Sequence, residues 1–295
     1  MAIKEHPSRP RILVAGCGSL GGEIARRLCA NAEVFGLRRN ISRVPEGVHP
    51  VAADLMQPQQ LQERVPADLD AIVYCLTPSQ YDDKGYADAY VHGLQNLLAA
   101  LSGRAPRRLV FISSTSVYPQ DDDSWVTEDS PCNPSRATGQ RILEGEQLAR
   151  QSGIPSTVIR YSGIYGPSRR RFLSEVLEGR MNPSQPAPYS NRIHEDDAAG
   201  AVVYLLEQAL SGAGIEDTYI VSDCEPVRLD EVVAWVRTQI SCAEPVADAR
   251  TGGRAGSKRC SNQRLLASGF QFRYPDYRAG YGEMIARERA NNQRP

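Results

Sequence analysis

The chain has 295 residues, enough for one large α/β domain or for a domain with a smaller appended lobe. A hydrophobic content of 41% excludes a disordered chain, and a formal net charge of -1 excludes a global attraction to nucleic acid or to an anionic membrane. No apolar run approaches the ~20 residues that span a bilayer, and the amino-terminal segment MAIKEHPSRP lacks the apolar stretch of a signal peptide. Seven cysteines without a CxxC pair are typical of buried or free thiols in a reducing cytosol, so we expect a cytoplasmic protein.

Short apolar runs alternate with longer helical patterns over the first half of the chain. The expected strands are RILVA (11–15), EVFGL (33–37), HPVAA (49–53), AIVYC (71–75), RLVFIS (108–113) and TVIRY (157–161). Continuous apolar strands suit a parallel sheet that is covered on both faces, and the intervening helices suit right-handed crossovers. The pattern therefore predicts an α/β Rossmann fold, with a doubly wound parallel sheet forming a dinucleotide-binding core over residues 1–162.

The composition changes after Tyr161. Residues 163–192 are rich in Gly, Pro, Arg and Ser, and residues 241–262 carry few apolar side chains, which predicts a long loop there. Between them lie a helix pattern (DDAAGAVVYLLEQAL), a strand pattern (TYIVS) and a second helix pattern (LDEVVAWVRTQI). We expect residues 163–295 to form mainly a small C-terminal substrate-binding lobe, with elements near 190–222 returning to the core.

The first strand runs into the sequence Gly16-Cys17-Gly18-Ser19-Leu20-Gly21, which matches G-x-G-x-x-G and opens a helix. In a dinucleotide-binding loop the first glycine permits the tight turn, the second lets the backbone approach a pyrophosphate, and the third packs helix on strand. The pyrophosphate then lies at the positive end of the helix dipole. We expect the cofactor to contact Gly16, Gly18, Ser19, Leu20 and Gly21; the alternative is a glycine-rich turn that binds nothing.

The end of the second strand distinguishes NAD from NADP. A carboxylate there would bind the adenosine ribose of NAD, but this strand ends in Arg38-Arg39, whose guanidinium groups suit a 2′-phosphate. We predict that NADP(H) is preferred and keep NAD(H) as the alternative cofactor; solvated surface arginines are the other interpretation. Asp54 is expected to accept from the adenine amino group, or else to cap the next helix. The remaining expected cofactor contacts are Leu55, Leu76, Thr77 and Tyr161.

Four motifs in this order resemble the extended short-chain dehydrogenase/reductases, the group that includes nucleotide-sugar epimerases and dehydratases. Besides the glycine loop they are Ser113–Tyr118 (SSTSVY), Arg160–Pro167 (RYSGIYGP) and Arg192–Ala198 (RIHEDDA). The resemblance runs over nearly the whole chain. It implies that Ser114, with its neighbour Thr115, hydrogen-bonds the substrate oxygen. It also implies a homodimer formed through the helices at 87–101 and 136–151, although one apolar stripe of such a helix must already face the sheet.

The sequence departs from this family at the catalytic pair. Family members carry Tyr-x-x-x-Lys, in which the tyrosine moves the proton and the lysine lowers its pKa. Here Thr138 and Ile142 occupy those positions, as in an atypical branch of the group. Arg141 could supply positive charge in place of the lysine. The phenols nearest the site in sequence are Tyr118, Tyr161 and Tyr165, for each of which a structural role is the better interpretation.

Three charged clusters remain. Adjacent residues point in different directions, so His194–Asp197 predicts a helix cap at Asp196 or Asp197 and no metal site. Asp121–Asp123 predicts a solvated turn. The arginines Arg169, Arg170 and Arg171 are expected to bind a phosphate or carboxylate of the substrate, with a solvated helix start as the alternative.

Together these features predict an NAD(P)-dependent oxidoreductase, epimerase or dehydratase acting on a small carbonyl, hydroxyl or nucleotide-sugar substrate. The alternative is a non-catalytic NADP(H)-binding sensor or regulatory protein. The absent tyrosine and lysine favour the sensor, whereas the Ser114 region and the lobe at 163–295 favour the enzyme.

Overall fold

A computed structural model describes residues 9–252 and 256–292, and these form two compact units. Unit 1 comprises residues 9–113, Ser135–Ile159 and Val202–Thr218, and unit 2 comprises the remaining described residues. Most of the amino-terminal segment considered above and three residues of the loop expected at 241–262 lie outside the described residues. Each unit is described by itself below.

The central element is a seven-stranded sheet with the order β11-β7-β5-β4-β1-β2-β3. Its strands are β1 (Arg11–Ala15), β2 (Glu33–Arg38), β3 (His49–Ala52), β4 (Ala71–Tyr74), β5 (Arg108–Ser114), β7 (Ser156–Tyr161) and β11 (Thr218–Val221). β1 pairs in parallel with both β2 and β4, and the sheet grows outward from it in both directions. This is the doubly wound Rossmann order, so the predicted fold class is confirmed.

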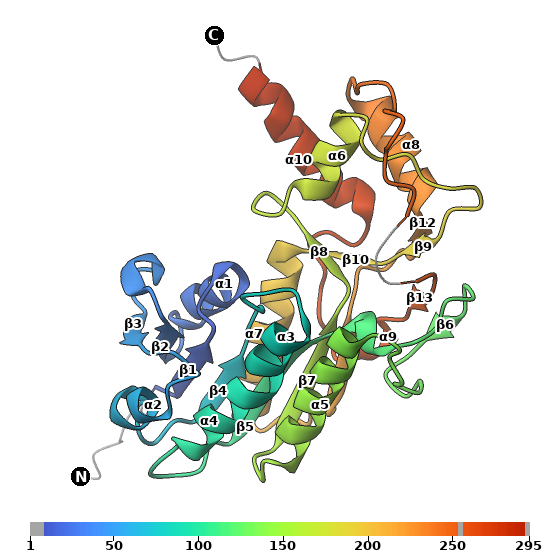
Figure 1. The fold of residues 1–295 in the computed structure, drawn as a ribbon. Helices are drawn as coiled ribbons and strands as arrows, with labels where there is room; N and C mark the ends of the chain where they lie inside the picture. The colour runs from blue at the N-terminus through green and yellow to red at the C-terminus, as the bar shows by residue number, and fades with distance from the viewer. Residues whose placement is uncertain (1–8, 253–255, 293–295) are drawn as a thin grey trace. The chain divides into compact units, whose positions relative to one another are not determined.

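The sheet of unit 1 is covered by helices on both of its faces. The helices are α1 (Ser19–Leu28), α2 (Pro58–Arg64), α3 (Asp83–Ala87), η2 (Asp88–His92), α4 (Gly93–Ala99) and α5 (Ala137–Gln151), with a short turn η1 at Ile41–Arg43. Leu13 of β1 packs in one buried cluster with Leu61 of α2 and Leu94 of α4. Val14 points to the opposite face, where Gly21 of α1 approaches it so closely that a Cβ would lie 3.4 Å from Val14 Cγ1. Figure 1 shows α4 and α5 side by side in front of the strands.

The helix expected at 87–101 is interrupted by the π-helical turn η2, Asp88–His92. The Tyr74 hydroxyl donates to the Ala89 carbonyl oxygen over 2.7 Å inside this turn. Gly93 follows directly, and a Cβ there would lie 2.7 Å from the same hydroxyl. The Tyr74 hydroxyl of β4 thus hydrogen-bonds a helix carbonyl oxygen at the point where the helix widens into a π-helical turn. Hydrophobic periodicity alone does not predict such a turn.

Unit 2 is built from short strand pairs and three longer helices. Its elements are β6 (Trp125–Val126), β8 (Gly163–Tyr165), α6 (Arg171–Leu177), β9 (Tyr189–Ser190), β10 (Arg192–His194), the start of α7 (Glu195–Ser211), β12 (Val227–Arg228), α8 (Leu229–Gln239), β13 (Arg259–Cys260), α9 (Gln263–Ala267) and α10 (Tyr277–Asn292), with a 3-10 turn η3 at Thr115–Val117. The pairs are β8 with β10, β9 with β12 and β6 with β13. Leu173 of α6, Val232 of α8 and Tyr281 of α10 belong to one buried cluster, and Figure 1 shows these three helices grouped together.

Arginine and aromatic side chains alternate across the short strands of unit 2. The Arg259 guanidinium lies 5.1 Å from the ring centre of Trp125 and 5.2 Å from that of Tyr189. Arg228 also lies over the Tyr189 ring, 4.5 Å from its centre. Each contact is a cation–π interaction, so the row ties β6, β13, β9 and β12 to one another. Trp125, at its end, remains 54% exposed.

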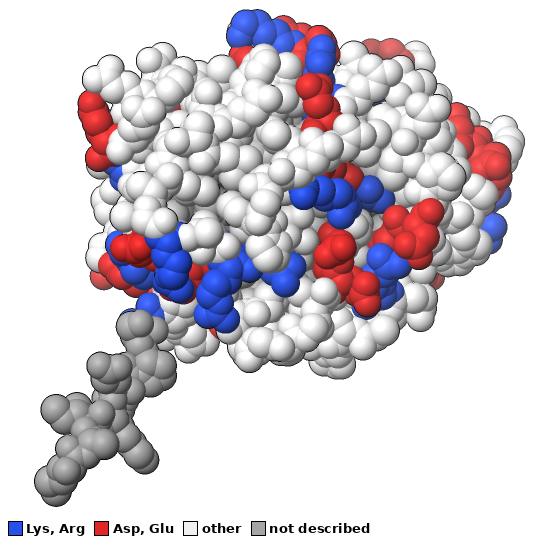
Figure 2. Space-filling model, turned by 90° about the horizontal axis from the view of Figure 1, so that it is seen from below, with Lys and Arg blue, Asp and Glu red and all other residues white. Residues whose placement is uncertain are grey.

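The surface carries charges of both signs. Lysine and arginine side chains lie among aspartate and glutamate on the face shown in Figure 2, as expected for 34 basic and 35 acidic residues. Among the described residues, no helix has the length and apolar character needed to cross a membrane. All seven cysteines are free thiols.

Candidate functional site

The glycine loop of unit 1 has the geometry of a phosphate cradle. Gly16 adopts a φ of +90°, and a Cβ there would lie 2.2 Å from the Cys75 carbonyl oxygen, so only glycine fits. A Cβ at Gly18, in contrast, would meet nothing nearer than 3.9 Å beyond its chain neighbours and would fill open space in front of the loop. No side chain caps α1 and no acidic residue lies in its first turn. The positive end of the helix is therefore available to an anion, and the residues fit a dinucleotide.

Arg38 joins the end of β2 to this loop. Its Nη1 donates to the Cys17 carbonyl oxygen over 2.9 Å and to the Arg43 carbonyl oxygen over 3.3 Å. The Cys17 thiol is buried beside the loop, and burial raises its pKa to about 11, so it stays protonated. Arg39 is exposed, and its guanidinium contacts no partner in the part of the chain that the structure describes.

The expected adenine contacts take two different arrangements. Asp54 Oδ1 accepts from the Met56 amide over 3.0 Å, and the Asp54 amide donates to Gln60 Oε1, so the carboxylate forms a local turn. Leu55 is buried and Leu76 is half-buried, and a Cβ at Gly16 would touch Leu76 Cδ2 at 2.9 Å. Thr77 is exposed after β4. These residues therefore lie around the carboxyl ends of β3 and β4.

Three further expected site residues belong to unit 2. Ser114 caps the start of η3, where its Oγ accepts from the Ser116 amide over 3.2 Å. Thr115 is buried and hydrogen-bonds the thiol of Cys260. The Tyr161 hydroxyl is buried and donates to the Ala198 carbonyl oxygen, so it is engaged within the fold.

The positions at which the sequence analysis expects the family tyrosine and lysine lie along one face of α5. Thr138, Ile142 and Glu146 follow one another at helical spacing, and Ile142 is 3% exposed. Glu146 is also buried and accepts from Ser113 Oγ over 2.5 Å, joining α5 to the end of β5. The sequence analysis missed Glu146, although the i, i+4, i+8 spacing after Thr138 was a signal that could have identified it.

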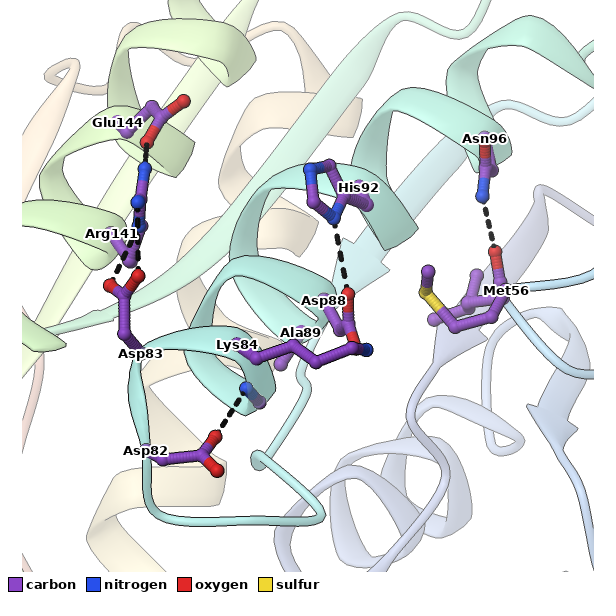
Figure 3. A network of polar contacts seen from close by, with 12 residues as sticks. Met56, Asp82, Asp83, Lys84, Asp88, Ala89, His92, Asn96, Arg141 and Glu144 are labelled. Carbon is purple, nitrogen blue, oxygen red and sulfur yellow. Dashed lines mark hydrogen bonds and ion pairs between the residues drawn. The ribbon is translucent and has the colours of Figure 1, made fainter.

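Arg141 is engaged in ion pairs, as Figure 3 shows. Its Nε and Nη2 contact the two carboxylate oxygens of Asp83 at 2.9 and 3.1 Å, and its Nη1 contacts Glu144 at 2.9 Å. Asp83 precedes η2, so the guanidinium links α5 to the neighbouring helices. A charge that is neutralised twice in this way is poorly placed to replace the missing lysine.

The two other candidate phenols are fully buried in unit 2. The Tyr118 hydroxyl accepts from Arg160 Nη1 over 2.7 Å, yet burial raises the pKa of Tyr118. Tyr165 packs its ring 4.4 Å from that of Tyr281, and burial raises its pKa as well. Its hydroxyl lies against Gly280, where a Cβ would clash with the hydroxyl oxygen. Both phenols are thus unsuited to proton transfer near neutral pH, as a structural role predicts.

Unit 2 contains a pocket of about 610 Å³. One part of its wall is apolar and aromatic, with Phe172 and Tyr281, whose ring centres are 5.5 Å apart. The other part is basic and includes Arg169 and Arg171, whereas Arg170 is absent from the lining and pairs with Glu288 of α10. The expected arginine run is therefore divided between the pocket and a helix contact.

The basic wall also contains residues that the sequence analysis missed. Glu175 is buried and accepts from Arg171 over 2.8 Å and from Arg250 over 2.6 Å. Lys258 and Arg192 line the same pocket and are both nearly inaccessible to solvent. The Arg169 guanidinium contacts no partner among the described residues. Basic groups far apart in sequence thus meet here, together with Thr115.

The acidic clusters are structural. Within the described ranges no group of His, Cys, Asp and Glu residues is arranged to hold a metal ion. α7 begins at Glu195, and Asp197 accepts from the amides of Arg273 and Tyr274 instead of capping that helix, because the segment before α10 packs against it. The turn expected to be solvated is also tied down, since Asp123 pairs with Arg228 over 2.7 Å.

A doubly wound sheet with a glycine loop between its first strand and helix defines a Rossmann-fold protein of the NAD-binding class. A family model, the NAD dependent epimerase/dehydratase family, matches residues 12–220. The 3-diazoavenalumate denitrifying reductase of a Streptomyces species is 30% identical over 224 residues, covering 68% of this chain and 74% of that protein. The chain belongs to the NAD dependent epimerase/dehydratase family.

Solved structures agree with this assignment. A protein from Methylobacillus flagellatus, named as an NAD-dependent epimerase/dehydratase, aligns with a TM-score of 0.80 and 39% identity over 96% of this chain and 100% of that one. A short-chain dehydrogenase/reductase superfamily protein from Agrobacterium tumefaciens, solved with bound NAD, aligns with a TM-score of 0.74 over 97% of this chain and 100% of that one. At 19% identity the second likeness shows the fold alone.

Proposed function

We propose that the protein is an NADP(H)-preferring oxidoreductase that acts on a small carbonyl or hydroxyl substrate. The observation that carries this proposal is the end of β2, where Arg38 is anchored to the glycine loop and Arg39 extends freely into solvent. The exposed Arg39 guanidinium can bind a phosphate on the adenosine ribose while Arg38 supports the loop, and the end of β2 carries no carboxylate to repel that phosphate. NAD(H) remains the alternative cofactor.

The glycine loop and Arg38 would hold the dinucleotide, with Leu55 and Leu76 beside it. When bound, the nicotinamide supplies or removes a hydride. The protein's own residues would orient the substrate oxygen and exclude water. Ser114 is the proposed donor to that oxygen, because its Oγ accepts a backbone N–H and its own proton is free to be donated outward. Thr115 would support it from inside the pocket of unit 2.

The pocket of unit 2 is the proposed substrate site. Its aromatic wall suits an apolar or planar group, and Arg169 with Arg171 suits a phosphate or carboxylate. One relative is named a reductase of a diazo compound, which favours reduction over epimerisation. A nucleotide sugar is the other substrate class that the family suggests.

A non-catalytic sensor is the second candidate function. The observation that favours it is the α5 face, where Thr138 and the buried Ile142 can supply neither a phenol nor an ammonium group. In a sensor, bound NADP(H) would change partner affinity or conformation without turnover.

Nicotinamide absorbance measured against a panel of small carbonyls, aromatic acids and sugar nucleotides separates the two functions. Turnover of any panel substrate refutes the sensor. Ser114→Ala should then lower kcat about 10²- to 10³-fold with little change in cofactor affinity. Equal loss in cofactor binding and kcat would contradict the proposed role of Ser114.

Restoring the family pair provides an independent test. Thr138→Tyr with Ile142→Lys raises turnover if the enzyme has only lost its acid–base pair. The double variant lowers turnover if the proton carrier lies elsewhere, because the new side chains crowd a packed helix face. In a sensor neither protein turns over substrate.

A homodimer through α4 and α5 and a cytoplasmic location stay predictions. The seven free thiols are compatible with a reducing compartment. Sedimentation of the purified protein decides the oligomeric state.

A further inference from the structure

The loss of the tyrosine–lysine pair leaves the proposed reaction without a proton carrier. Arginines stay charged and cannot exchange a proton near neutral pH. In the pocket of unit 2, Glu175 is held between Arg171 and Arg250, and burial raises the pKa values of Tyr165 and Tyr281. Two titratable side chains of the pocket wall remain, Tyr189 and Lys258.

Tyr189 is the weaker candidate because its ring is clamped. Arg259 and Arg228 lie 5.2 and 4.5 Å from the ring centre, and Tyr189 begins the strand β9 that pairs with β12. The ring therefore serves to join strands. The variant Tyr189→Phe tests whether its hydroxyl takes part in proton transfer.

Lys258 is fixed in the pocket wall by its neighbours in sequence. The Ser257 amide donates to Asp121 Oδ1 over 2.6 Å, and Arg259 Nε donates to the Asp123 carbonyl oxygen over 2.8 Å. Arg259 also pairs in register with Trp125 of β6. The backbone on both sides of Lys258 is thus held in place.

The ammonium group of Lys258 faces the segment that follows Thr115. Nζ donates to the carbonyl oxygens of Tyr118 at 3.0 Å and Gln120 at 3.5 Å, and the whole residue is only 3% exposed. Thr115 and Lys258 border the same pocket.

Burial favours a Lys258 amine that can lose its proton. Burial lowers the pKa of Lys258, and Asp121 and Cys260 oppose this shift. The pocket wall adds Arg169, Arg171, Arg192 and Arg250 against the single carboxylate of Glu175. A desolvated lysine near other cations is the usual setting of a lysine that exchanges protons.

The composition makes this lysine more notable. Only three of the 34 basic residues are lysines, at positions 4, 84 and 258. Arginine serves almost every other basic position, including four in the same pocket. The buried pocket position is thus one of the few occupied by the basic side chain that can give up its proton.

We propose that Lys258 is the proton-exchanging residue of this pocket and replaces the absent tyrosine–lysine pair. The inference rests on the proposed reductase function. In the reduction, hydride from a reduced nicotinamide reaches the carbonyl carbon, the C=O π pair moves onto oxygen, and that oxygen takes a proton from Nζ. The neutral amine then regains a proton from water. Oxidation of a hydroxyl runs through the same steps in reverse.

The first test needs no substrate or cofactor. The full-length protein is acetylated with acetic anhydride over a range of pH, and the labelling rates of Lys84 and Lys258 are followed by peptide mass spectrometry. Lys84 is the internal reference, because its ion pair with Asp88 raises its pKa. The midpoint for Lys258 should lie below that for Lys84. A midpoint at or above that of Lys84 overturns the proposal.

The second test uses turnover. Lys258→Gln keeps a donor for the Tyr118 carbonyl but carries no exchangeable charge, and it should lower kcat at least about 100-fold while NADPH affinity stays unchanged. Lys258→Arg should not rescue turnover, since arginine retains the charge but not the titration. Lys84→Gln is the matched control and should keep wild-type turnover.

Three outcomes overturn the proposal: turnover of Lys258→Gln within about threefold of wild type, rescue by Lys258→Arg, or a loss of turnover of about 100-fold in Tyr189→Phe while Lys258→Gln stays active. If the wild-type protein binds no dinucleotide, the proposed function fails, and the labelling comparison alone still decides whether Lys258 has the required pKa.

Discussion

Arg38 Nη1 lies 2.9 Å from the Cys17 carbonyl oxygen, so the end of β2 and the glycine loop are held together by one side chain. Arg39, one residue later, makes no such contact within the described chain. The two adjacent arginines therefore have separable effects. Arg38→Ala should weaken binding of both NADP(H) and NAD(H), because the loop loses a support.

Arg39→Ala should weaken NADP(H) alone, about 10- to 100-fold, the value of one charge-assisted hydrogen bond. Isothermal titration of both variants with both cofactors measures the four affinities. Equal loss for NAD(H) and NADP(H) in Arg39→Ala would remove the basis for the proposed cofactor preference.

Gly18→Val should abolish dinucleotide binding with little loss of stability. The new Cβ enters the open space in front of the loop, and the branched side chain occupies the position of a pyrophosphate. Gly214→Val is the matched control, since a Cβ at Gly214 meets no atom within 4 Å. Titration with NADPH and a thermal melt are sufficient measurements. Normal binding in Gly18→Val would show that the loop is not the phosphate cradle.

Glu146→Ala should destabilise the protein by about 2–4 kcal/mol, because Ser113 and the surrounding polar groups lose a buried partner. Ser113→Ala removes one neutral donor and should cost only about 1 kcal/mol. Arg141→Ala, an exposed ion-pair residue on the same helix, should leave the free energy of unfolding near that of wild type. Urea unfolding measures the free energy of unfolding of each of the three variants. A loss in Glu146→Ala as small as that in Arg141→Ala would show that the buried Glu146–Ser113 hydrogen bond contributes little to stability.

Asp223 should make stability fall as pH rises. It is 1% exposed, and burial raises its pKa to about 7, with Arg192 opposing the shift. Between the ordinary carboxyl pKa and about 7 the folded state binds more protons than the unfolded state, so the free energy of unfolding decreases with pH in that window. The contribution is about 2–3 kcal/mol between about pH 5 and pH 7.5.

Asp223→Asn removes this titration while keeping the shape of the side chain. The free energy of unfolding of the variant minus that of wild type should therefore be larger at about pH 7.5 than at about pH 5. Urea midpoints at both pH values provide the comparison. A constant difference between the two proteins would mean that Asp223 ionises normally in the folded state.

The sheet and the cofactor loop were predictable because their signals are local. The strands β1 to β5 and β7 each fall in a short, mainly apolar run, and G-x-G-x-x-G depends on three glycines within six residues. The strands β6, β9, β12 and β13 have two residues each, too few for any periodicity to appear.

The pocket of unit 2 was not predictable for the same physical reason. Lys258 and the Tyr118 carbonyl that it contacts are 140 residues apart in sequence. Arg170, unlike Arg169 and Arg171, lies outside the pocket and pairs with Glu288, 118 residues away. Contacts of that range depend on how the short strands and helices pack, and no local pattern encodes them. Thr138 and Ile142 are the opposite case, since the prediction that they occupy the family's tyrosine and lysine positions needs only their spacing after Ser113–Tyr118.

The positions of the two tryptophans determine which part of the protein can be followed by fluorescence during unfolding. The chain has two tryptophans, Trp125 at the end of the cation–π row and Trp235 packed edge-on against Tyr277 at 5.5 Å, and both belong to unit 2. Indole emission therefore monitors unit 2 alone, and unit 1 can melt without any tryptophan signal. Fluorescence and far-ultraviolet circular dichroism, recorded on the same sample, would separate the melting of the two units if they unfold independently.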